Sequence, residues 1–316
     1  GYFDHPPFVA WVIRFFSFLP DHEFSVRVGF LFMQLASIGV LLKLTKEKTW
    51  GILLFFSFPL ASFAGLLALP DGPLLFMTSL YCLWLKNFLN HKTIMNSIIL
   101  GGIIALLLYS KYHGILVVIL TLIAVPNIIF SRYFYIVFGV AFLFFLPHLF
   151  WQYEHDFITL QYHFFERPKS GFSLKNIFEY LAIQFILSGF LFSPVIWKNL
   201  IQTKVTDPFL RSMKFIVLGS FVFFFISTMS KKFEANWIIY TSIPMILFYA
   251  NTSKNISYKG KLSLISSFLI IFLMKFIFII DPKLSGIRRL KEFSGWQDWA
   301  FRVGVRQGCR PWLRRM

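Results

Sequence analysis

Two ionisable side chains stand in very short polar connectors between long apolar runs. Asp71 lies in Pro-Asp-Gly-Pro at 70–73, and Lys111 lies in Ser-Lys-Tyr-His-Gly at 110–114. A carboxylate this close to hydrocarbon is costly to ionise and is usually functional, although Pro, Asp and Gly are also the expected residues of a plain hairpin turn. Lys111 is either a snorkelling lysine or a ligand for an anionic lipid phosphate.

A carboxylate and an imidazole come together near the start of the sequence, in Tyr-Phe-Asp-His-Pro-Pro at 2–7. The two prolines restrict the backbone directly after Asp4 and His5. These side chains are therefore either presented rigidly at the membrane edge or belong to a turn that precedes the apolar stretch at 8–19.

The longest polar connector, in the middle of the chain, holds the densest group of ionisable residues. Glu154, His155 and Asp156 follow one another, and His163 and Arg167 are one helical turn apart. Aromatic residues at a span end are typical of the interfacial belt, but this many ionisable side chains exceed what a belt requires.

A shorter segment at 231–237 repeats the mixture of cation, acid and aromatic, with Glu234 and Asn236. These connectors therefore share a mixture of acids, cations and aromatic residues.

The elements that position these residues are membrane spans. Of the 316 residues, 57% are hydrophobic, 14% are charged and 43 are Phe. A soluble domain carries roughly 25% charged residues, and a water-soluble core could not absorb this much apolar surface. The net charge of +17 fits basic loops facing anionic headgroups, and we expect no nucleic-acid partner.

Apolar runs broken by short connectors predict an all-α membrane protein that crosses the bilayer about ten times. The stretch at 8–19 is too short for a span and is predicted to be an interfacial helix. The predicted spans are 24–43, 50–69, 73–88, 93–109, 114–130, 134–150, 177–198, 214–230, 236–250 and 262–280.

The distribution of charge between alternate loops predicts the orientation. Thirteen Lys and Arg residues fall in one set of loops and eight in the other, so the first set is placed in the cytoplasm. A basic tail at 281–316 then falls outside. Of the acids in the loops, only Glu47 and Asp207 are on the cytoplasmic side, which is either chance clustering or the sign of an acid-rich working surface outside.

Five motifs resemble, in order and at comparable spacing, the polytopic glycosyltransferases related to dolichyl-phosphate-mannose protein mannosyltransferases. The resemblance covers residues 1 to about 240. It rests on Gly-Tyr-Phe-Asp-His-Pro-Pro-Phe at 1–8 with Trp11, Asp-Gly-Pro-Leu at 71–74, Ser-Lys-Tyr at 110–112, Pro147 through Trp151 into Glu-His-Asp-Phe at 154–157, and Phe-Glu-Ala-Asn-Trp at 233–237.

The resemblance implies a fold of the GT-C type, with a transmembrane domain over 1–280 and the active site at the outer face. It implies a polyprenyl-phosphate-linked sugar as the donor and an inverting displacement at the anomeric carbon, with or without a divalent metal. Relatives carry their principal catalytic Asp shortly before the motif that begins at Tyr2. We therefore expect the main catalytic Asp upstream of Gly1, and this chain to be a truncated form that lacks its first span.

The resemblance also assigns roles by position. Asp71 matches an active-site carboxylate, and Lys111 matches a lysine that faces the carrier phosphate. Asp4 matches a catalytic-site acid that helps hold a metal in some relatives, and His163 resembles a histidine that pairs with such an acid. The carrier phosphate is expected to contact His5 and Arg167 as well, while Glu154, His155, Asp156, Glu234 and Asn236 are further outer-face candidates.

The sequence thus predicts a bacterial inner-membrane glycosyltransferase that works at the periplasmic or exterior face. Its acceptor is a lipid, a protein or a glycan. A transporter or flippase for lipid-linked sugars remains the alternative. Transporters usually place polar groups near the bilayer midplane, whereas here only Lys275 lies deep in an apolar run.

Overall fold

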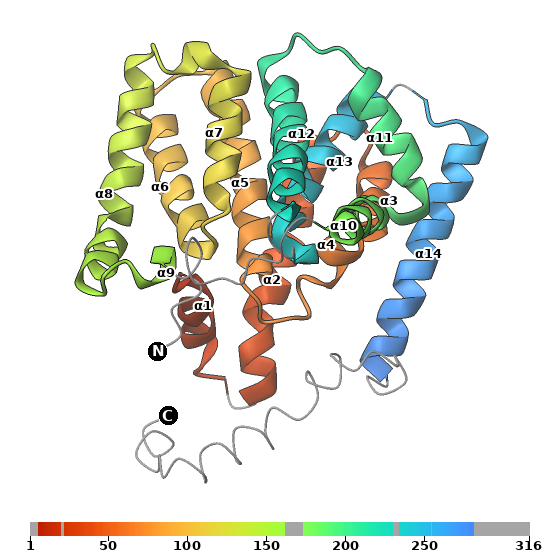
Figure 1. The fold of residues 1–316 in the computed structure, drawn as a ribbon, viewed down its shortest axis with the longest axis horizontal. Helices are drawn as coiled ribbons and strands as arrows, with labels where there is room; N and C mark the ends of the chain where they lie inside the picture. Colours follow the sequence, from red (N-terminus) through yellow and green to blue (C-terminus); the bar gives the residue numbers. More distant parts are fainter. Residues whose placement is uncertain (1–5, 20–21, 162–172, 230–233, 254, 281–316) are drawn as a thin grey trace. The chain divides into compact units, whose positions relative to one another are not determined.

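The computed structural model describes residues 6–19, 22–161, 173–229, 234–253 and 255–280, and every regular element in these ranges is a helix (Figure 1). The expected all-helical fold is confirmed. The helices are α1 (Phe8–Phe16), α2 (His22–Leu44), α3 (Lys48–Ser57), α4 (Pro59–Phe63), α5 (Asp71–Asn90), α6 (Ile94–Ser110), α7 (Gly114–Ala124), η1 (Pro126–Ile128), α8 (Arg132–Glu154), α9 (Ile158–Gln161), α10 (Leu174–Leu187), η3 (Phe190–Phe192), α11 (Ser193–Gln202), α12 (Pro208–Thr228), η4 (Ala235–Thr241), α13 (Ser242–Thr252) and α14 (Tyr258–Ile280).

Contacts divide the chain into two units, residues 1–268 and 269–316, with the boundary inside α14. The division expected from the sequence, with a basic tail at 281–316, stays a prediction because that tail lies outside the described residues. The features described below belong to the first unit, apart from the part of α14 after Phe268.

The first unit is organised around α13, in which every residue from Ser242 to Ala250 is buried. It packs against α12, α3 and α11. Helix α8, in contrast, carries exposed aromatic side chains, since Phe138 is 60% and Phe142 48% exposed. Rows of exposed aromatics are unfavourable in water and favourable in lipid, so the pattern of burial is that of a membrane-embedded bundle.

Four helices are long and apolar enough to cross a membrane, and a bent pair could form a fifth span. They are Ser25–Leu44, Arg132–Glu154, Pro208–Thr228 and Tyr258–Ile277, and the bent pair is Leu174–Leu187 with Phe190–Gln202. The expected total of ten spans is not confirmed by these criteria.

The stretch expected as one span at 177–198 is two helices, α10 and α11, that meet at an angle of 103°. Gly189 adopts φ +111° at the break, a backbone conformation that glycine accommodates best. The Ser188 hydroxyl donates to the carbonyls of Gln184 and Phe185, so backbone groups at the end of α10 remain satisfied inside the bundle.

The stretch expected as one span at 50–69 is also broken. Helix α3 ends at Ser57, and the short helix α4 begins at Pro59, because proline cannot donate a helical hydrogen bond. The buried Gln34 side chain donates to the carbonyls of Ala61 and Ser62, at 2.7 and 2.8 Å. These hydrogen bonds tie α2 to α4, just before the irregular backbone that leads to α5.

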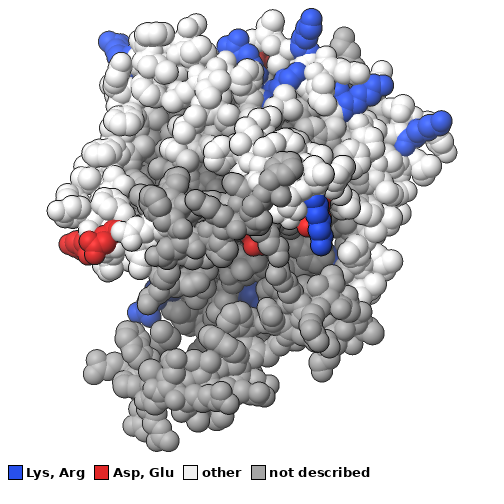
Figure 2. All heavy atoms as spheres, in the orientation of Figure 1, with Lys and Arg blue, Asp and Glu red and all other residues white. Residues whose placement is uncertain are grey.

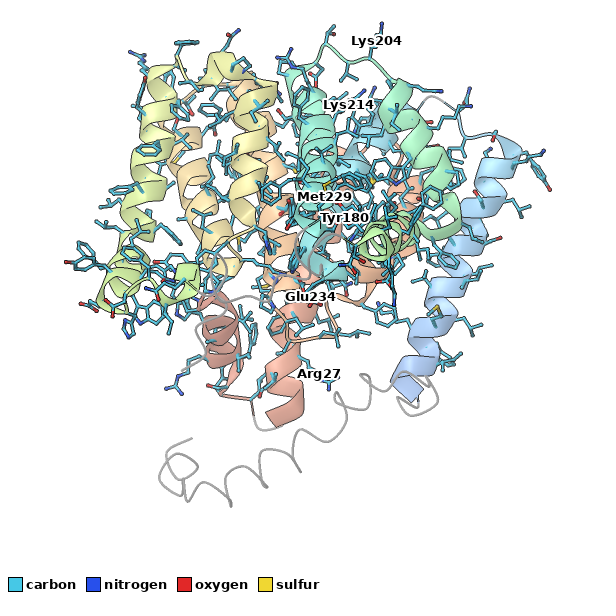
Figure 3. All side chains as sticks on the ribbon, in the orientation of Figure 1. Arg27, Tyr180, Lys204, Lys214, Met229 and Glu234 are labelled. Carbon is cyan, nitrogen blue, oxygen red and sulfur yellow. The ribbon has the colours of Figure 1, made fainter. Side chains whose placement is uncertain are left out.

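Basic side chains are most frequent at one end of the bundle. Figure 2 shows several of them near the top of the view, where α11 meets α12, while the acidic side chains at the α8–α9 corner lie lower. In Figure 3, Lys204 and Lys214 lie at the first end, and Glu234 and Arg27 lie toward the second. The orientation that the loop charges predict stays a prediction.

Candidate functional site

Asp71 is the first residue of α5 and is 6% exposed. The chain reaches it through the irregular residues 64–70, which pass very close to the start of the helix. A Cβ on Gly72 would lie 3.1 Å from the Ala64 carbonyl oxygen and 3.2 Å from the Phe30 ring. The Asp-Gly pair therefore has a structural reason beyond turn formation: the glycine admits the neighbouring backbone, and the carboxylate lies at the positive end of the helix dipole.

Lys111 directly follows α6 and is 3% exposed. The chain reverses within residues 111–113, and α7 begins at Gly114. A Cβ on Gly114 would lie 2.8 Å from Leu107 Cγ and 3.0 Å from the Leu107 carbonyl oxygen. Only glycine allows α7 to start this close to the end of α6, and the tight reversal holds Lys111 at the end of the bundle that carries Asp71.

The fold brings Asp71, Lys111 and Asn236 into direct contact. Lys111 Nζ donates to Asp71 Oδ1 at 3.0 Å, and Asn236 Nδ2 donates to Asp71 Oδ2 at 2.7 Å. The three residues come from α5, the α6–α7 connector and η4. Both carboxylate oxygens are engaged, so Asp71 is fixed in position and compensates the charge of a nearly buried ammonium.

The buried ion pair between Lys111 and Asp71 is better explained by ligand binding than by a contribution to stability. Burying two opposite charges has a desolvation penalty that their attraction often only offsets. Among the described residues, Asp71 is the one hydrogen-bond partner that Lys111 Nζ has, and an ammonium has three donors. The remaining donors are therefore available to a ligand with anionic oxygens.

A second polar cluster adjoins the first through Tyr112, the residue after Lys111. Its hydroxyl lies 2.7 Å from His148 Nε2 and accepts from Gln152 Nε2 at 2.7 Å. The sequence interpretation did not single out His148 or Gln152. Their signal was available, since polar residues four apart in an apolar run lie on one face of the helix.

The acidic corner at the end of α8 is separate from the Asp71 cluster. Glu154, His155 and Asp156 are exposed, and the His155 ring stacks on Trp151 with centroids 4.4 Å apart. No hydrogen bond or ion pair joins these three to Asp71 or Lys111 within the described ranges. Glu234 is exposed as well.

Four of the predicted site residues, Asp4, His5, His163 and Arg167, lie outside the described residues. The metal predicted for Asp4 and His163 is therefore untested. Within the described part of the chain, no group of three or more His, Cys, Asp and Glu is arranged to hold a metal ion.

The principal catalytic Asp that the sequence resemblance expects upstream of Gly1 also stays a prediction. Gly1 itself lies outside the described residues, and the sequence in hand begins with it. The geometry that the structure describes is that of the Asp71 cluster and the adjoining Tyr112 cluster.

Comparison with known proteins gives three matches. The model of the dolichyl-phosphate-mannose-protein mannosyltransferase family matches residues 4–151, a stretch that includes Asp71 and Lys111. The lipid A galacturonosyltransferase RgtD of Rhizobium johnstonii is 25% identical over 215 residues, which are 62% of this chain and 45% of the relative.

The third match is to the solved structure of ArnT from Cupriavidus metallidurans. Its complex with undecaprenyl phosphate has a TM-score of 0.64 at 16% sequence identity, over 85% of this chain and 53% of ArnT. The apo state has a TM-score of 0.63 at 16% identity, over 91% and 56%. The chain therefore has the ArnT fold and spans about half the length of the relatives it matches.

The helical membrane bundle and its fold define a polytopic membrane protein of the GT-C type. The chain is similar to the dolichyl-phosphate-mannose-protein mannosyltransferase family over residues 4–151 and to a lipid A galacturonosyltransferase, and it shares the fold of ArnT. The resemblance seen in the sequence motifs is confirmed.

Proposed function

We propose that this chain is the membrane domain of a glycosyltransferase that moves a sugar from a polyprenyl-phosphate carrier to an acceptor at the outer face of the bacterial inner membrane. The observation that carries the proposal is the buried Lys111 ammonium, held by Asp71 at 3.0 Å at the end of the bundle. The ArnT structure with undecaprenyl phosphate supports this carrier, and the name of the relative RgtD supports lipid A as the first acceptor to test.

In the proposed reaction, an acceptor hydroxyl oxygen attacks the anomeric carbon opposite the phosphate. The bond from that carbon to the phosphate oxygen breaks, and the lipid phosphate leaves with the electron pair. Lys111 stabilises the charge that develops on the phosphate. Asp71 holds the ammonium in place, and Asn236 holds Asp71.

The hydroxyl proton passes to a carboxylate acting as general base. Both oxygens of Asp71 already accept hydrogen bonds, which favours a positioning role for this residue. Asp4, the other catalytic candidate from the sequence, is then the better choice for the base within this chain.

The test is binding of undecaprenyl phosphate to the purified chain in lipid nanodiscs, compared with Lys111→Met. Hydrogen bonds to charged groups contribute ~1.5–3 kcal/mol, so the affinity is expected to fall roughly tenfold or more. Lys175→Met is the matched control, because the Lys175 side chain is 81% exposed and is expected to leave binding unchanged. Equal affinities of wild type and Lys111→Met would contradict the proposal.

A flippase for lipid-linked sugars is favoured by one observation, the broken helix α10–η3–α11, because transporters often bind substrates at broken helices. Yet the polar groups at this break are the uncharged Gln184, Ser188 and Ser193, and they hydrogen-bond within the bundle. Transfer of a labelled sugar from undecaprenyl phosphate to lipid A distinguishes the two functions, since a flippase moves the intact donor across the membrane without cleaving it.

A further inference from the structure

The Tyr112 hydroxyl is the centre of a polar cluster that joins the α6–α7 connector to α8. His148 Nε2 lies 2.7 Å from this oxygen, and Gln152 Nε2 donates to it at 2.7 Å. Gln152 also donates to Thr159 Oγ1 in α9 at 2.8 Å. The phenol in the reversal between α6 and α7 is therefore linked to α8 directly and to α9 through Gln152.

Tyr112 is partly exposed, and the members of the cluster on α8 and α9 are buried. Exposure is 7% for His148, 4% for Gln152 and 0% for Thr159. Gln152 Oε1 is buried and makes no hydrogen bond within the described part of the chain. A buried hydrogen-bond network that leaves one acceptor unpaired stabilises a fold less than apolar side chains would in the same place. Stability alone therefore does not account for this arrangement.

The position of Tyr112 gives the cluster a specific mechanical effect. Lys111 lies between two anchors, because its own amide donates to the Leu107 carbonyl at 3.3 Å and the next side chain is held by α8. When the two Tyr112 hydrogen bonds are removed, the reversal is no longer held by α8 through this side chain. It is then still held by the end of α6 and by the start of α7.

We propose that Tyr112, clamped by His148 and Gln152, is a positioning residue that sets the Lys111 ammonium for the carrier phosphate. The inference rests on the proposed function of Lys111. It predicts that the phenol hydroxyl affects recognition of the phosphate and leaves binding of the isoprenoid chain unchanged.

The test compares Tyr112→Phe with Tyr109→Phe in the purified chain. Tyr109 also lies near the end of α6, is 7% exposed and donates to α8, through a 3.1 Å bond to the Phe144 carbonyl. Both variants keep an aromatic ring and lose a hydroxyl that bonds to α8. The probes are undecaprenyl phosphate and undecaprenol, which lacks the phosphate.

Tyr112→Phe is expected to weaken undecaprenyl phosphate binding roughly tenfold, because the two hydrogen bonds that hold the reversal to α8 are lost. Undecaprenol binding and thermal stability should stay at the level of Tyr109→Phe. Gln152→Met, which removes one of the two bonds, should give a smaller loss in the same direction and provides the test if Tyr112→Phe does not fold.

Two results would overturn the inference: equal phosphate affinity in Tyr112→Phe and Tyr109→Phe, or parallel losses for both lipids. The proposed function then still stands if Lys111→Met loses phosphate binding. If the wild-type chain binds undecaprenol as well as undecaprenyl phosphate, the proposed function itself fails.

Discussion

Removing the Asp71 carboxylate should destabilise the bundle by leaving a cation without its counter-charge. The Lys111 and Asp71 side chains are 4% and 8% exposed. Breaking a buried pair by removing one partner costs ~3–5 kcal/mol. In Asp71→Asn, the single amide oxygen can accept from Lys111 or from Asn236, and the amide nitrogen then faces the other donor. We expect a loss near the lower figure, about 3 kcal/mol, because the flexible lysine stem can move its ammonium toward water.

The double-mutant cycle with Lys111→Met makes the reasoning quantitative. Lys111→Met alone leaves a buried carboxylate and should also lose about 3 kcal/mol. The double variant Asp71→Asn/Lys111→Met has neither charge of the buried pair, and the amide oxygen of the introduced asparagine still accepts a hydrogen bond from Asn236. It should therefore lose only about 1–2 kcal/mol, less than either single variant. Carrier binding should be lost in all variants that lack Lys111.

The assay is equilibrium unfolding of the purified chain in one detergent system, followed by helical circular dichroism. Glu179→Gln is the control, because the Lys175–Glu179 pair is 3.8 Å long with side chains 81% and 48% exposed, and such pairs contribute a few tenths of a kcal/mol. Losses that add within about 0.5 kcal/mol would refute the contact between Asp71 and Lys111, whatever the size of the single effects.

Three further predictions test the elements that support the site. Asn236→Leu should lower carrier affinity severalfold, measured by undecaprenyl phosphate binding, because one oxygen of Asp71 loses its donor at 2.7 Å; unchanged affinity would mean that Asn236 does not hold the carboxylate. Gly114→Ala should destabilise the chain by about 1–3 kcal/mol in the same unfolding assay, because the alanine Cβ would lie 2.8 Å from Leu107 Cγ. Unchanged stability would mean that α7 can shift to make room for the methyl group. Gly189→Ala should cost about 1–2 kcal/mol, because alanine is strained at φ +111°, and wild-type stability in this variant would argue against the break between α10 and α11.

Two glycines serve as matched controls for those glycine substitutions. A Cβ at Gly102 or Gly139 would have no atom within 4 Å outside its own helix. Alanine in a helix interior is favoured over glycine by roughly 0.5–1 kcal/mol, so Gly102→Ala and Gly139→Ala should leave stability unchanged or raise it.

Much of the helical framework was predictable from residue order alone, because a helix satisfies its own backbone within consecutive residues. The spans expected at 24–43, 93–109 and 134–150 coincide closely with α2, α6 and α8. The spans expected at 50–69 and 177–198 were wrong as continuous helices. Their breaks depend on the Gln34 side chain, which reaches across from α2, and on the conformation of Gly189, which apolar composition does not reveal.

The sequence by itself determined that this is a membrane protein and that Asp71 and Lys111 stand where spans end, because hydrophobicity and connector length are local properties. It did not determine that the two meet, since they are separated by 40 positions. The Asn236 contact spans 165 positions, and the Tyr112 cluster depends on the face of α8 that turns toward α6. Only the packing of the helices sets those pairings, because a hydrogen bond across the bundle requires the distance and direction of both side chains at once.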